Sequence, residues 1–358
     1  MSSRLLLSGN DALTGTIRFG IIGCGALGLV HALRLIELPN VEVTALSDPD
    51  TAGMERVKAA LEAQGVSYPI ACYTDYHDLL KADGLTATCI NSPNPWHVEQ
   101  LLASLEHGLH VLCEKPLSMI PAEVEQVSKA TEQSGKLVAI AYQSRYRHDS
   151  RVLRQLLQSG KFGRVTSVNV LSCENWLTPN WGTWRHDPAR CPGGFFADAN
   201  GHQLDVLFWM TGLEAAELRA TIEKRGTPVP MVTWGEARLR NQSTKALEGA
   251  EPTLFTFSFI GDSRLWREHI SIQTEKADFV MRDTQLLWSE GTAPLARFPE
   301  ELLDSPVGDD TPDTAFVNAL RGVSPILSPP ESVSPVLNFT LAALHSAETA
   351  SATVKIEP

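Results

Sequence analysis

The stretch that most narrowly limits how this chain can fold runs from residue 16 to residue 48. It reads TIRFGIIGCGALGLVHALRLIELPNVEVTALSD. Its first letters are apolar and β-branched, whereas ALGLVHALRLIEL carries apolar residues at helical spacing. Gly23, Gly25 and Gly28 stand where the two patterns meet, in the order G-x-G-x-x-G. A strand, a glycine turn and a helix in this order predict the first unit of a parallel α/β sheet.

The same turn is typical of a dinucleotide-binding site. Gly23 allows the tight turn, Gly25 lets a pyrophosphate approach the backbone, and Gly28 lets the helix pack closely on the strand. Asp48, twenty residues after Gly28, ends the next predicted strand, where its carboxylate would bind ribose hydroxyls and repel a 2′-phosphate. We therefore expect NAD in preference to NADP; a purely structural glycine turn is the alternative. The turn residues predicted to contact the cofactor are Gly23, Cys24, Gly25, Ala26, Leu27 and Gly28.

Strand and helix patterns continue to alternate as far as residue 143. Strands are expected at 87–93, 110–116 and 136–143, and helices at 51–65, 96–108 and 121–135. Strands that alternate with helices of this length form βαβ units. We therefore predict an N-terminal arm at 1–15 and a Rossmann NAD-binding domain at 16–144.

A different pattern follows from residue 145 to residue 358. Longer strands are expected at 164–175, 217–225, 253–261, 268–283 and 284–289, with helices at 150–163, 200–211, 313–322 and 336–350. Long strands in succession predict an α+β domain with a large, mostly antiparallel sheet. We expect this second domain, 145–358, to bind substrate and to mediate oligomerisation.

Composition limits the partners of the chain. Lys and Arg number 30 against 42 Asp and Glu, so the net charge of −12 disfavours nucleic acid and anionic membrane surfaces. No apolar run is long enough to span a bilayer, and the first residues do not read as a signal peptide. The six cysteines include no CxxC pair, so neither a disulfide framework nor a metal site is expected. These features predict a cytoplasmic protein.

Two loops follow predicted strands at the edge where open α/β sheets bind ligands. The first holds Asn91, Ser92, Pro93 and Asn94, and His97 after it would either reach the cofactor or be structural. The second is the Cys-Glu-Lys-Pro sequence at 113–116.

Lys115 stands immediately before a proline and is therefore biased to an extended backbone, which would aim its side chain out of the sheet edge. Its ammonium would donate to a substrate hydroxyl beside the nicotinamide. Glu114 would orient the lysine or the nicotinamide ribose. A solvated Lys-Glu pair is the alternative.

A polar row begins the predicted helix near residue 200. Asp198, His202 and Asp205 are spaced i, i+4, i+7, so they would share one face if the helix starts near Asp198. At a helix N-terminus the imidazole would stay neutral and able to accept a proton. The alternative is a structural histidine that is buried with its hydrogen bonds satisfied. Metal binding by this row is also possible, but the sequence shows no further cluster of metal ligands.

Together these motifs resemble the Gfo/Idh/MocA family of NAD(P)-dependent sugar and inositol oxidoreductases. The resemblance extends from Ile17 to the final TVKI and rests on EKP, on WRHDP before a glycine cluster, and on D-x-x-x-H-x-x-D. It implies that Lys115, Asp198 and His202 form the catalytic set. Two departures stand beside the site, Pro192 in the usual glycine triplet and Asn200 in the usual D-x-G-x-H.

The resemblance also implies binding residues. Cofactor contacts are implied for Ser92, Pro93, His97, Gln143, Trp184 and Arg185, besides the loop and turn residues above and Glu114. The substrate site would comprise Lys115, Arg145, Asn175, Trp176, Trp184, His186, Asp198 and His202. The tryptophans would cover the C–H face of a polyhydroxylated ring or, alternatively, pack the second domain's sheet.

The expected activity is oxidation of a ring secondary alcohol of a sugar, sugar derivative or cyclitol by NAD. Two alternatives stay open, an NAD-dependent redox-neutral glycosidase and a non-catalytic NAD-bound sensor resembling the fungal galactose-pathway repressor. The resemblance further implies a homodimer or homotetramer, paired through the open face of the second-domain sheet.

Overall fold

The computed structural model describes residues 5–243, 252–299, 301, 303, 307–308 and 310–357. Two compact units are present, the first formed by 1–142 and 310–333 and the second by 143–309 and 334–358. The chain first passes from unit 1 to unit 2 after residue 142, within two residues of the predicted boundary at 144. Among the described residues, no helix combines the length and apolarity needed to cross a bilayer.

The segment 310–333 corrects the predicted domain division. It was expected in the second domain, but it belongs to unit 1. Its helix α10 (Pro312–Leu320) places Phe316 against Phe19, with ring centroids 6.2 Å apart. The N-terminal arm also belongs to unit 1, where the Leu7 N–H donates to the Ala319 carbonyl at 3.0 Å. Both segments are held there because their apolar side chains complete the core of that unit.

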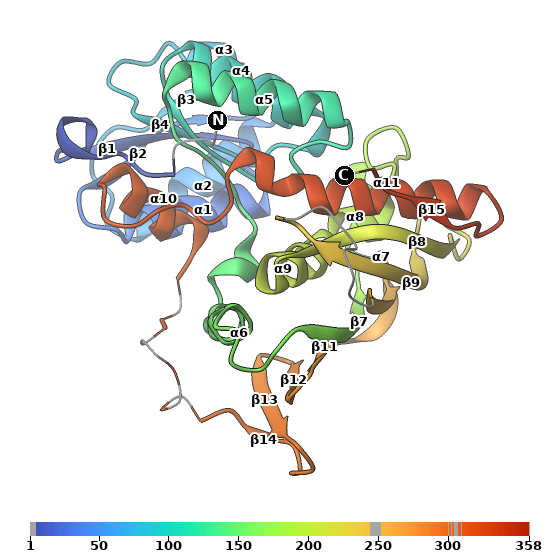
Figure 1. Ribbon diagram of the computed structural model, residues 1–358. Coiled ribbons are helices and arrows are strands. Elements are labelled where there is room, and N and C mark those ends of the chain that lie inside the picture. The colour runs from blue at the N-terminus through green and yellow to red at the C-terminus, as the bar shows by residue number, and fades with distance from the viewer. Residues whose placement is uncertain are drawn as a thin grey trace. The chain divides into compact units, whose positions relative to one another are not determined.

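Unit 1 contains a parallel sheet with the strand order β3-β2-β1-β4-β5-β6. Helices α4 and α5 cover one face and α1, α2 and α10 the other (Figure 1). Every residue of β4, β5 and β6 is buried, as expected for strands covered on both faces. The strand order reverses between β1 and β4, and ligands of such sheets bind beside that point.

The strands of unit 1 are β1 (Ile17–Ile22), β2 (Val41–Ser47), β3 (Ala71–Tyr73), β4 (Ala87–Ile90), β5 (His110–Cys113) and β6 (Val138–Ile140). Its α-helices besides α10 are α1 (Ala26–Ile36), α2 (Thr51–Ala63), α3 (Tyr76–Leu79), α4 (His97–Glu106) and α5 (Pro121–Ser134). Short 3₁₀ helices are η1 (Gly9–Asp11), η2 (Asn94–Trp96) and η6 (Pro330–Val333). The predicted strands and helices are all present, whereas β3 and α3 were not predicted.

Unit 2 contains a nine-stranded sheet in the order β14-β13-β12-β11-β7-β10-β9-β8-β15. Within the described part of the chain, β7 and β10 are its one parallel pair, so the prediction of a mostly antiparallel sheet is confirmed. The prediction of one strand over 268–283 is wrong. The chain turns at Glu275 and Lys276, and the two halves pair as antiparallel β11 and β12.

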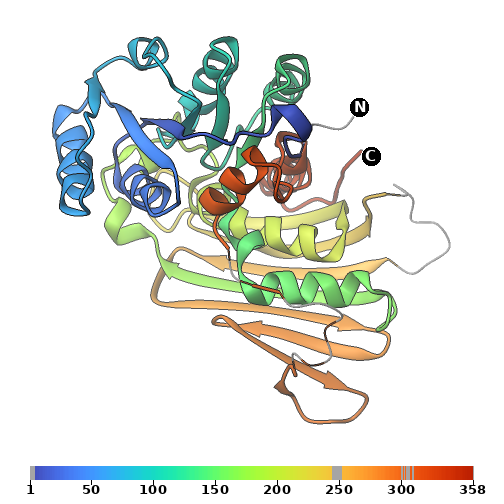
Figure 2. The same ribbon diagram turned by 90° about the vertical axis from the view of Figure 1, so that its left-hand side faces the viewer.

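The strands of unit 2 are β7 (Val165–Asn175), β8 (Leu213–Glu223), β9 (Val232–Asn241), β10 (Thr253–Ile260), β11 (Asp262–Thr274), β12 (Ala277–Arg282), β13 (Gln285–Glu290), β14 (Ala296–Arg297) and β15 (Val354–Lys355). Its helices are η3 (Gln143–Tyr146), α6 (His148–Gln158), α7 (Leu177–Asn180), η4 (Trp184–His186), α8 (Gly194–Asp198), α9 (Gly201–Thr211) and α11 (Ser334–Glu348). Strand β9 was not predicted. Figure 2 shows α6 and α9 running along one face of this sheet.

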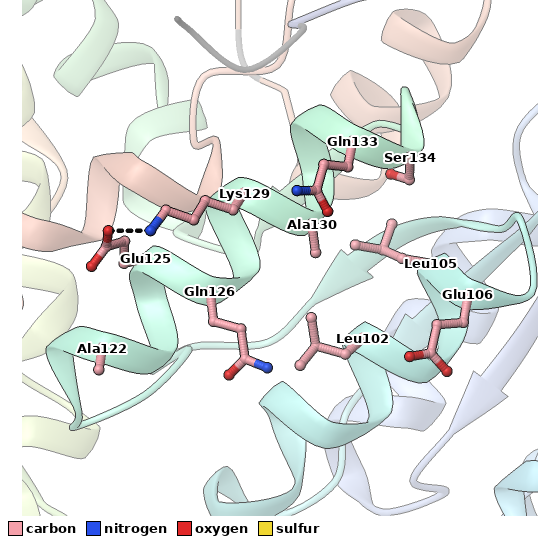
Figure 3. Close-up of a pocket in the computed structure, with 10 residues that line it drawn as sticks. All are labelled: Leu102, Leu105, Glu106, Ala122, Glu125, Gln126, Lys129, Ala130, Gln133 and Ser134. Atoms are coloured by element: carbon pink, nitrogen blue, oxygen red, sulfur yellow. Dashed lines mark ion pairs between the residues drawn. The ribbon is translucent and has the colours of Figure 1, made fainter.

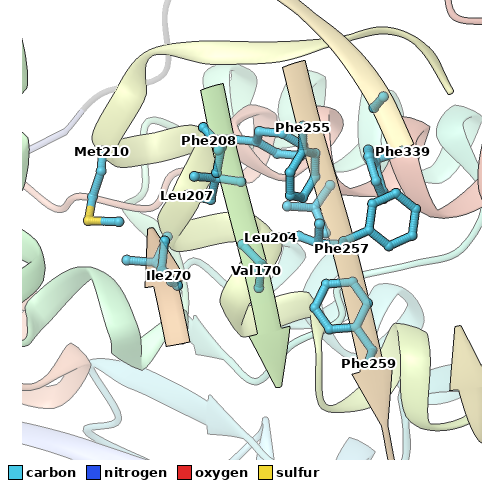
Figure 4. Close-up of a cluster of buried hydrophobic side chains, with 14 of the residues drawn as sticks. Val170, Leu204, Leu207, Phe208, Met210, Phe255, Phe257, Phe259, Ile270 and Phe339 are labelled. Atoms are coloured by element: carbon cyan, nitrogen blue, oxygen red, sulfur yellow. The ribbon is translucent and has the colours of Figure 1, made fainter. Parts of the chain in front are cut away.

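A cluster of aromatic rings forms the centre of the unit 2 core (Figure 4). Phe339 of α11 is fully buried, and its ring centroid lies 5.7 Å from that of Phe208, 5.6 Å from that of Phe255 and 5.2 Å from that of Phe257. Side chains alternate along a strand, so Leu254 points to the opposite face and is 56% exposed. The core therefore lies on one face of the sheet.

We expect Phe339→Ala to lower the free energy of unfolding of unit 2 by about 3–5 kcal/mol, because it leaves a cavity among three rings. All tryptophans except Trp96 lie in unit 2, so their fluorescence during urea unfolding reports on that unit. Leu265→Ala is the matched control, since that side chain is 65% exposed, and should cost less than about 1 kcal/mol. Equal losses in the two variants would contradict this assignment of the core.

Candidate active site

The glycine turn between β1 and α1 is shaped by close approaches that exclude side chains. Gly23 has φ of +90°, and a Cβ added there would lie 2.6 Å from the Ser92 nitrogen. A Cβ at Gly28 would lie 2.0 Å from the Gly23 carbonyl oxygen. Both positions therefore require glycine, as predicted.

Gly25 differs from its two neighbours because a Cβ built on it meets no atom within 4 Å. It is the N-cap residue of α1, and no side chain caps the helix there. The first backbone N–H groups of an α-helix have no intrahelical partner, and beside open space they fit a pyrophosphate at the helix N-terminus. This turn would hold the diphosphate of NAD.

Asp48 follows β2 and supports the glycine turn. Its Oδ2 accepts a hydrogen bond from the Cys24 N–H at 2.7 Å, and its Oδ1 accepts one from the Asp50 N–H at 2.8 Å. Each carboxylate oxygen keeps a second lone pair for a ribose hydroxyl, and that contact stays a prediction. Burial and the nearby Asp48 charge raise the pKa of the Cys24 thiol to about 12, so no thiolate lies beside the turn at neutral pH.

His97 connects the two loops that were predicted at the sheet edge. The ring is buried, with Nδ1 2.8 Å from the Pro116 carbonyl oxygen and Nε2 2.8 Å from the Ser92 carbonyl oxygen. Burial lowers the pKa of His97, so the neutral ring donates to one carbonyl at a time. These contacts give His97 a structural role, and its direct contact with the cofactor stays a prediction.

Lys115 belongs to the second loop and stands two residues after the end of β5 at Cys113. The Glu114 side chain is buried, and its Oε2 accepts a hydrogen bond from the Lys115 backbone N–H at 3.0 Å. The peptide bond between Lys115 and Pro116 is cis. Glu114 thus contacts the backbone of Lys115, and both predicted roles, orienting the lysine and contacting the ribose, stay predictions.

Several predicted substrate residues meet in unit 2 around Asp198. Its Oδ2 accepts hydrogen bonds from Trp176 Nε1 and from Arg185 Nε, both at 2.9 Å. The Arg185 guanidinium lies over the Trp184 ring, 4.4 Å from its centroid. The His186 ring lies 5.5 Å from the Trp176 ring. The irregular stretch before α8 therefore gathers these side chains at one carboxylate.

The predicted row on one helix face is not present. The helix is interrupted at residues 199–200, so Asp198 ends α8 while His202 and Asp205 belong to α9. Asp205 instead binds Arg145, with Nε to Oδ2 at 2.7 Å and Nη2 to Oδ1 at 2.5 Å. His202 is half-buried in the first turn of α9. Asp198 therefore belongs to a different helix from His202 and Asp205, and its carboxylate accepts a hydrogen bond from Trp176.

The two departures from the family pattern have local explanations. Asn200 adopts φ of −76° and donates from Nδ2 to the Phe195 carbonyl at 3.2 Å, so glycine is not required there. Gly194 has φ of +51°, and a Cβ on it would lie 2.4 Å from the Pro230 carbonyl oxygen. The turn therefore needs glycine at Gly194 and tolerates Pro192 two residues earlier.

The remaining predicted residues are placed as follows. Arg145 is only 3% exposed, and its buried charge is paired with Asp205. Asn175 ends β7 and accepts a hydrogen bond from the Thr178 N–H at 3.2 Å, and Gln143 begins η3. Asn94 begins η2, and Ser92 Oγ donates to Gln100 Oε1 at 2.6 Å. Their contacts with ligands stay predictions.

A groove between α4 and α5 lies apart from these residues (Figure 3). Leu102 and Leu105 line it from α4, and Gln126 and Ala130 from α5. It contains none of the predicted site residues. Among the described residues, no group of three His, Cys, Asp or Glu side chains is arranged to hold a metal ion.

Comparison with known proteins establishes the family. The model of the oxidoreductase family with an NAD-binding Rossmann fold matches residues 17–142, and the GFO/IDH/MocA C-terminal domain matches residues 150–257. The chain therefore belongs to the Gfo/Idh/MocA family, and it is an NAD-binding oxidoreductase.

Named relatives are about a quarter identical to this chain over the aligned residues. D-glucoside 3-dehydrogenase of Escherichia coli K12 is 27% identical over 263 residues, 72% of this chain and 71% of the relative. Myo-inositol 2-dehydrogenase of Thermotoga maritima is 26% identical over 204 residues, 57% of this chain and 58% of the relative. A levoglucosan dehydrogenase solved with NADH and levoglucosan shares the fold, with a TM-score of 0.78 and 16% identity over 96% of this chain and 100% of the other.

Two buried residues near Glu114 were not identified from the sequence. One contacts Glu114, and the other contacts the first. They are His31 of α1 and Asp313 of α10. A signal for His31 was available, because Gly28, Ala32 and Leu35 place it on the stripe of α1 that faces the core. Nothing in the local sequence indicates Asp313 as its partner.

Replacing Asp48 by serine should weaken NAD binding roughly tenfold and narrow the preference for NAD over NADP. The reason is that the variant loses hydrogen bonds worth about 1 kcal/mol each and the charge that repels a 2′-phosphate. Titration of NADH and NADPH fluorescence measures both affinities. Asp50→Ser is the matched control, because it removes a nearby charge while serine can still cap α2 at the Ala52 N–H. An unchanged ratio of the two affinities in Asp48→Ser would refute the ribose contact.

Proposed function

We propose that this protein oxidises a ring secondary alcohol of a neutral sugar, sugar derivative or cyclitol to a ketone, with NAD as the hydride acceptor. The observation that carries the proposal is Lys115, which follows β5 in the same parallel sheet as β1, with β4 between the two strands, and whose backbone N–H is bound to buried Glu114. The relatives named as D-glucoside and myo-inositol dehydrogenases support this substrate class.

Three side chains carry the proposed chemistry. His202 takes the proton of the substrate hydroxyl as a general base. Lys115 donates a hydrogen bond to the same oxygen and stabilises its developing negative charge. Asp198 is held by Trp176 and Arg185, and its remaining lone pairs accept hydrogen bonds from the substrate. Bound NAD supplies the redox chemistry, and the protein supplies position and electrostatics.

The aromatic residues near Asp198 suit a polyhydroxylated ring. Trp181 is 65% exposed, and its ring lies 5.2 Å from that of His186. Indole faces cover C–H surface, while neighbouring polar groups bind hydroxyls. Burial lowers the pKa of His186, so its neutral ring offers a hydrogen bond without adding positive charge. The Arg185 guanidinium is engaged by Asp198, which favours neutral substrates over phosphorylated ones.

A panel of polyols and sugars with excess NAD, followed at the absorbance of NADH, tests the reaction class. A dehydrogenase accumulates NADH continuously on at least one member of the panel. A redox-neutral glycosidase would instead release a sugar from a glycoside without net NADH. That result would replace the proposed reaction with the alternative.

Replacing Lys115 by alanine should leave NAD affinity within about threefold and lower kcat by a factor of roughly 10²–10⁴, the range for loss of one positioned donor. Lys129→Ala is the matched control, because Lys129 is exposed on α5 and pairs with Glu125. Steady-state kinetics and NADH binding separate the two effects. Wild-type turnover in Lys115→Ala would refute the catalytic role.

We also propose that two copies of the chain pair through the face of the unit 2 sheet that lies opposite its hydrophobic core. Trp234 and Leu254 project from this face and are 49% and 56% exposed. A Trp234→Glu and Leu254→Glu double variant should shift the solution mass from a dimer or tetramer toward a monomer, as measured by light scattering. An unchanged mass would exclude this face.

A further inference from the structure

A buried histidine in unit 1 lies between two carboxylates. His31 of α1 is 1% exposed. Its Nδ1 lies 2.6 Å from Asp313 Oδ1, and its Nε2 lies 3.1 Å from Glu114 Oε1. A carboxylate only accepts hydrogen bonds, so the ring can satisfy both partners only when each of its nitrogens carries a proton.

The surrounding charges favour that doubly protonated ring. Burial lowers the pKa of His31, but the interactions of its ring with Cys89, Asp313 and Glu114 outweigh burial and hold this pKa well above its usual range. Arg34 Nη1 lies 3.6 Å from the second oxygen of Asp313. One imidazolium and one guanidinium therefore balance two carboxylates, which is the condition for keeping such charges buried.

The cluster connects three separate parts of unit 1. His31 projects from α1, the helix whose N-terminus begins at the glycine turn, and Asp313 belongs to the returning segment 310–333. The second oxygen of Glu114 accepts the hydrogen bond of the Lys115 N–H. The Glu114 carboxylate thus joins the His31 ring on one side to the Lys115 backbone on the other.

We propose that His31 is a positioning residue for Lys115, anchored by Asp313 and acting through Glu114. This inference rests on the catalytic role proposed for Lys115. The protonated ring fixes the Glu114 carboxylate, and the carboxylate fixes the backbone from which the lysine side chain projects. The same ring stands on the helix that would hold the diphosphate, so the cofactor turn and the lysine are kept in one geometry.

Kinetics of His31→Gln and Asp313→Asn test the proposal. Glutamine can donate to only one of the two carboxylates, and asparagine removes the charge that holds the ring. We expect kcat to fall about 10- to 100-fold, the range for a small misplacement of a catalytic group, while KM and the NAD affinity stay within about threefold. His107→Gln is the matched control, because that ring is exposed at the end of α4. Wild-type kcat in folded His31→Gln would overturn the proposal.

A second measurement begins with the wild-type holoenzyme and does not depend on how the His31 and Asp313 variants fold. Nitrogen-15 shifts of the labelled histidine rings should show His31 protonated at both nitrogens at neutral pH. Glu114→Gln should lower the pH at which it loses a proton. A singly protonated, neutral His31 ring at pH 7 would overturn the proposal whatever the kinetics show.

Lys115→Ala, measured in parallel, separates this inference from the proposed function. Impaired Lys115→Ala together with wild-type-like His31→Gln refutes the positioning role alone. Wild-type turnover in Lys115→Ala refutes both. Loss of kcat in both variants, with NAD binding kept and the ring doubly protonated, supports both.

Discussion

The close packing of α1 against the end of β1 is the constraint on which the nucleotide half of the site depends. Any side chain at Gly28 would overlap the carbonyl of Gly23, so only the bare backbone allows the helix to start where it does. That start leaves open space beside Gly25, the N-cap residue of α1. One turn after Gly28 it also brings His31 to the carboxylate of Glu114. The glycines thus set the start of α1, the helix from which His31 contacts Glu114.

The periodic part of unit 1 could be predicted because its strands and helices differ in hydrophobic period and end at glycines. Gly108 and Gly135 have φ of +74° and +65° at the ends of α4 and α5, as their positions in the sequence indicated. Strand β3 escaped prediction because it is three residues long and two of them are exposed. Local pattern also does not show which core a helix joins, and α10 was therefore assigned to the wrong unit.

For the site too, the local sequence indicated some residues but not the partners that they contact. Residue types and short spacings pointed to the glycine turn, to Lys115 and to the surroundings of Asp198. The partners of those residues are separated widely in sequence, as Arg145 is from Asp205 by 60 positions and His31 from Asp313 by 282. A pairing at such a separation is decided by packing. The helix break at 199–200 is accompanied by the Asn200 side-chain hydrogen bond to the Phe195 carbonyl, which the spacing of polar residues does not indicate.

The nucleotide-binding unit is discontinuous in the chain, since 310–333 returns to it after the whole of 143–309. A contiguous fragment that stops near residue 142 would lack both Phe316, which packs on Phe19, and the carboxylate that anchors His31. Recombination that joins this nucleotide-binding unit to a foreign partner at a single junction would therefore produce a defective chimera. A functional chimera would have to replace only the residues between 142 and 310 and keep the segment 310–333 in place.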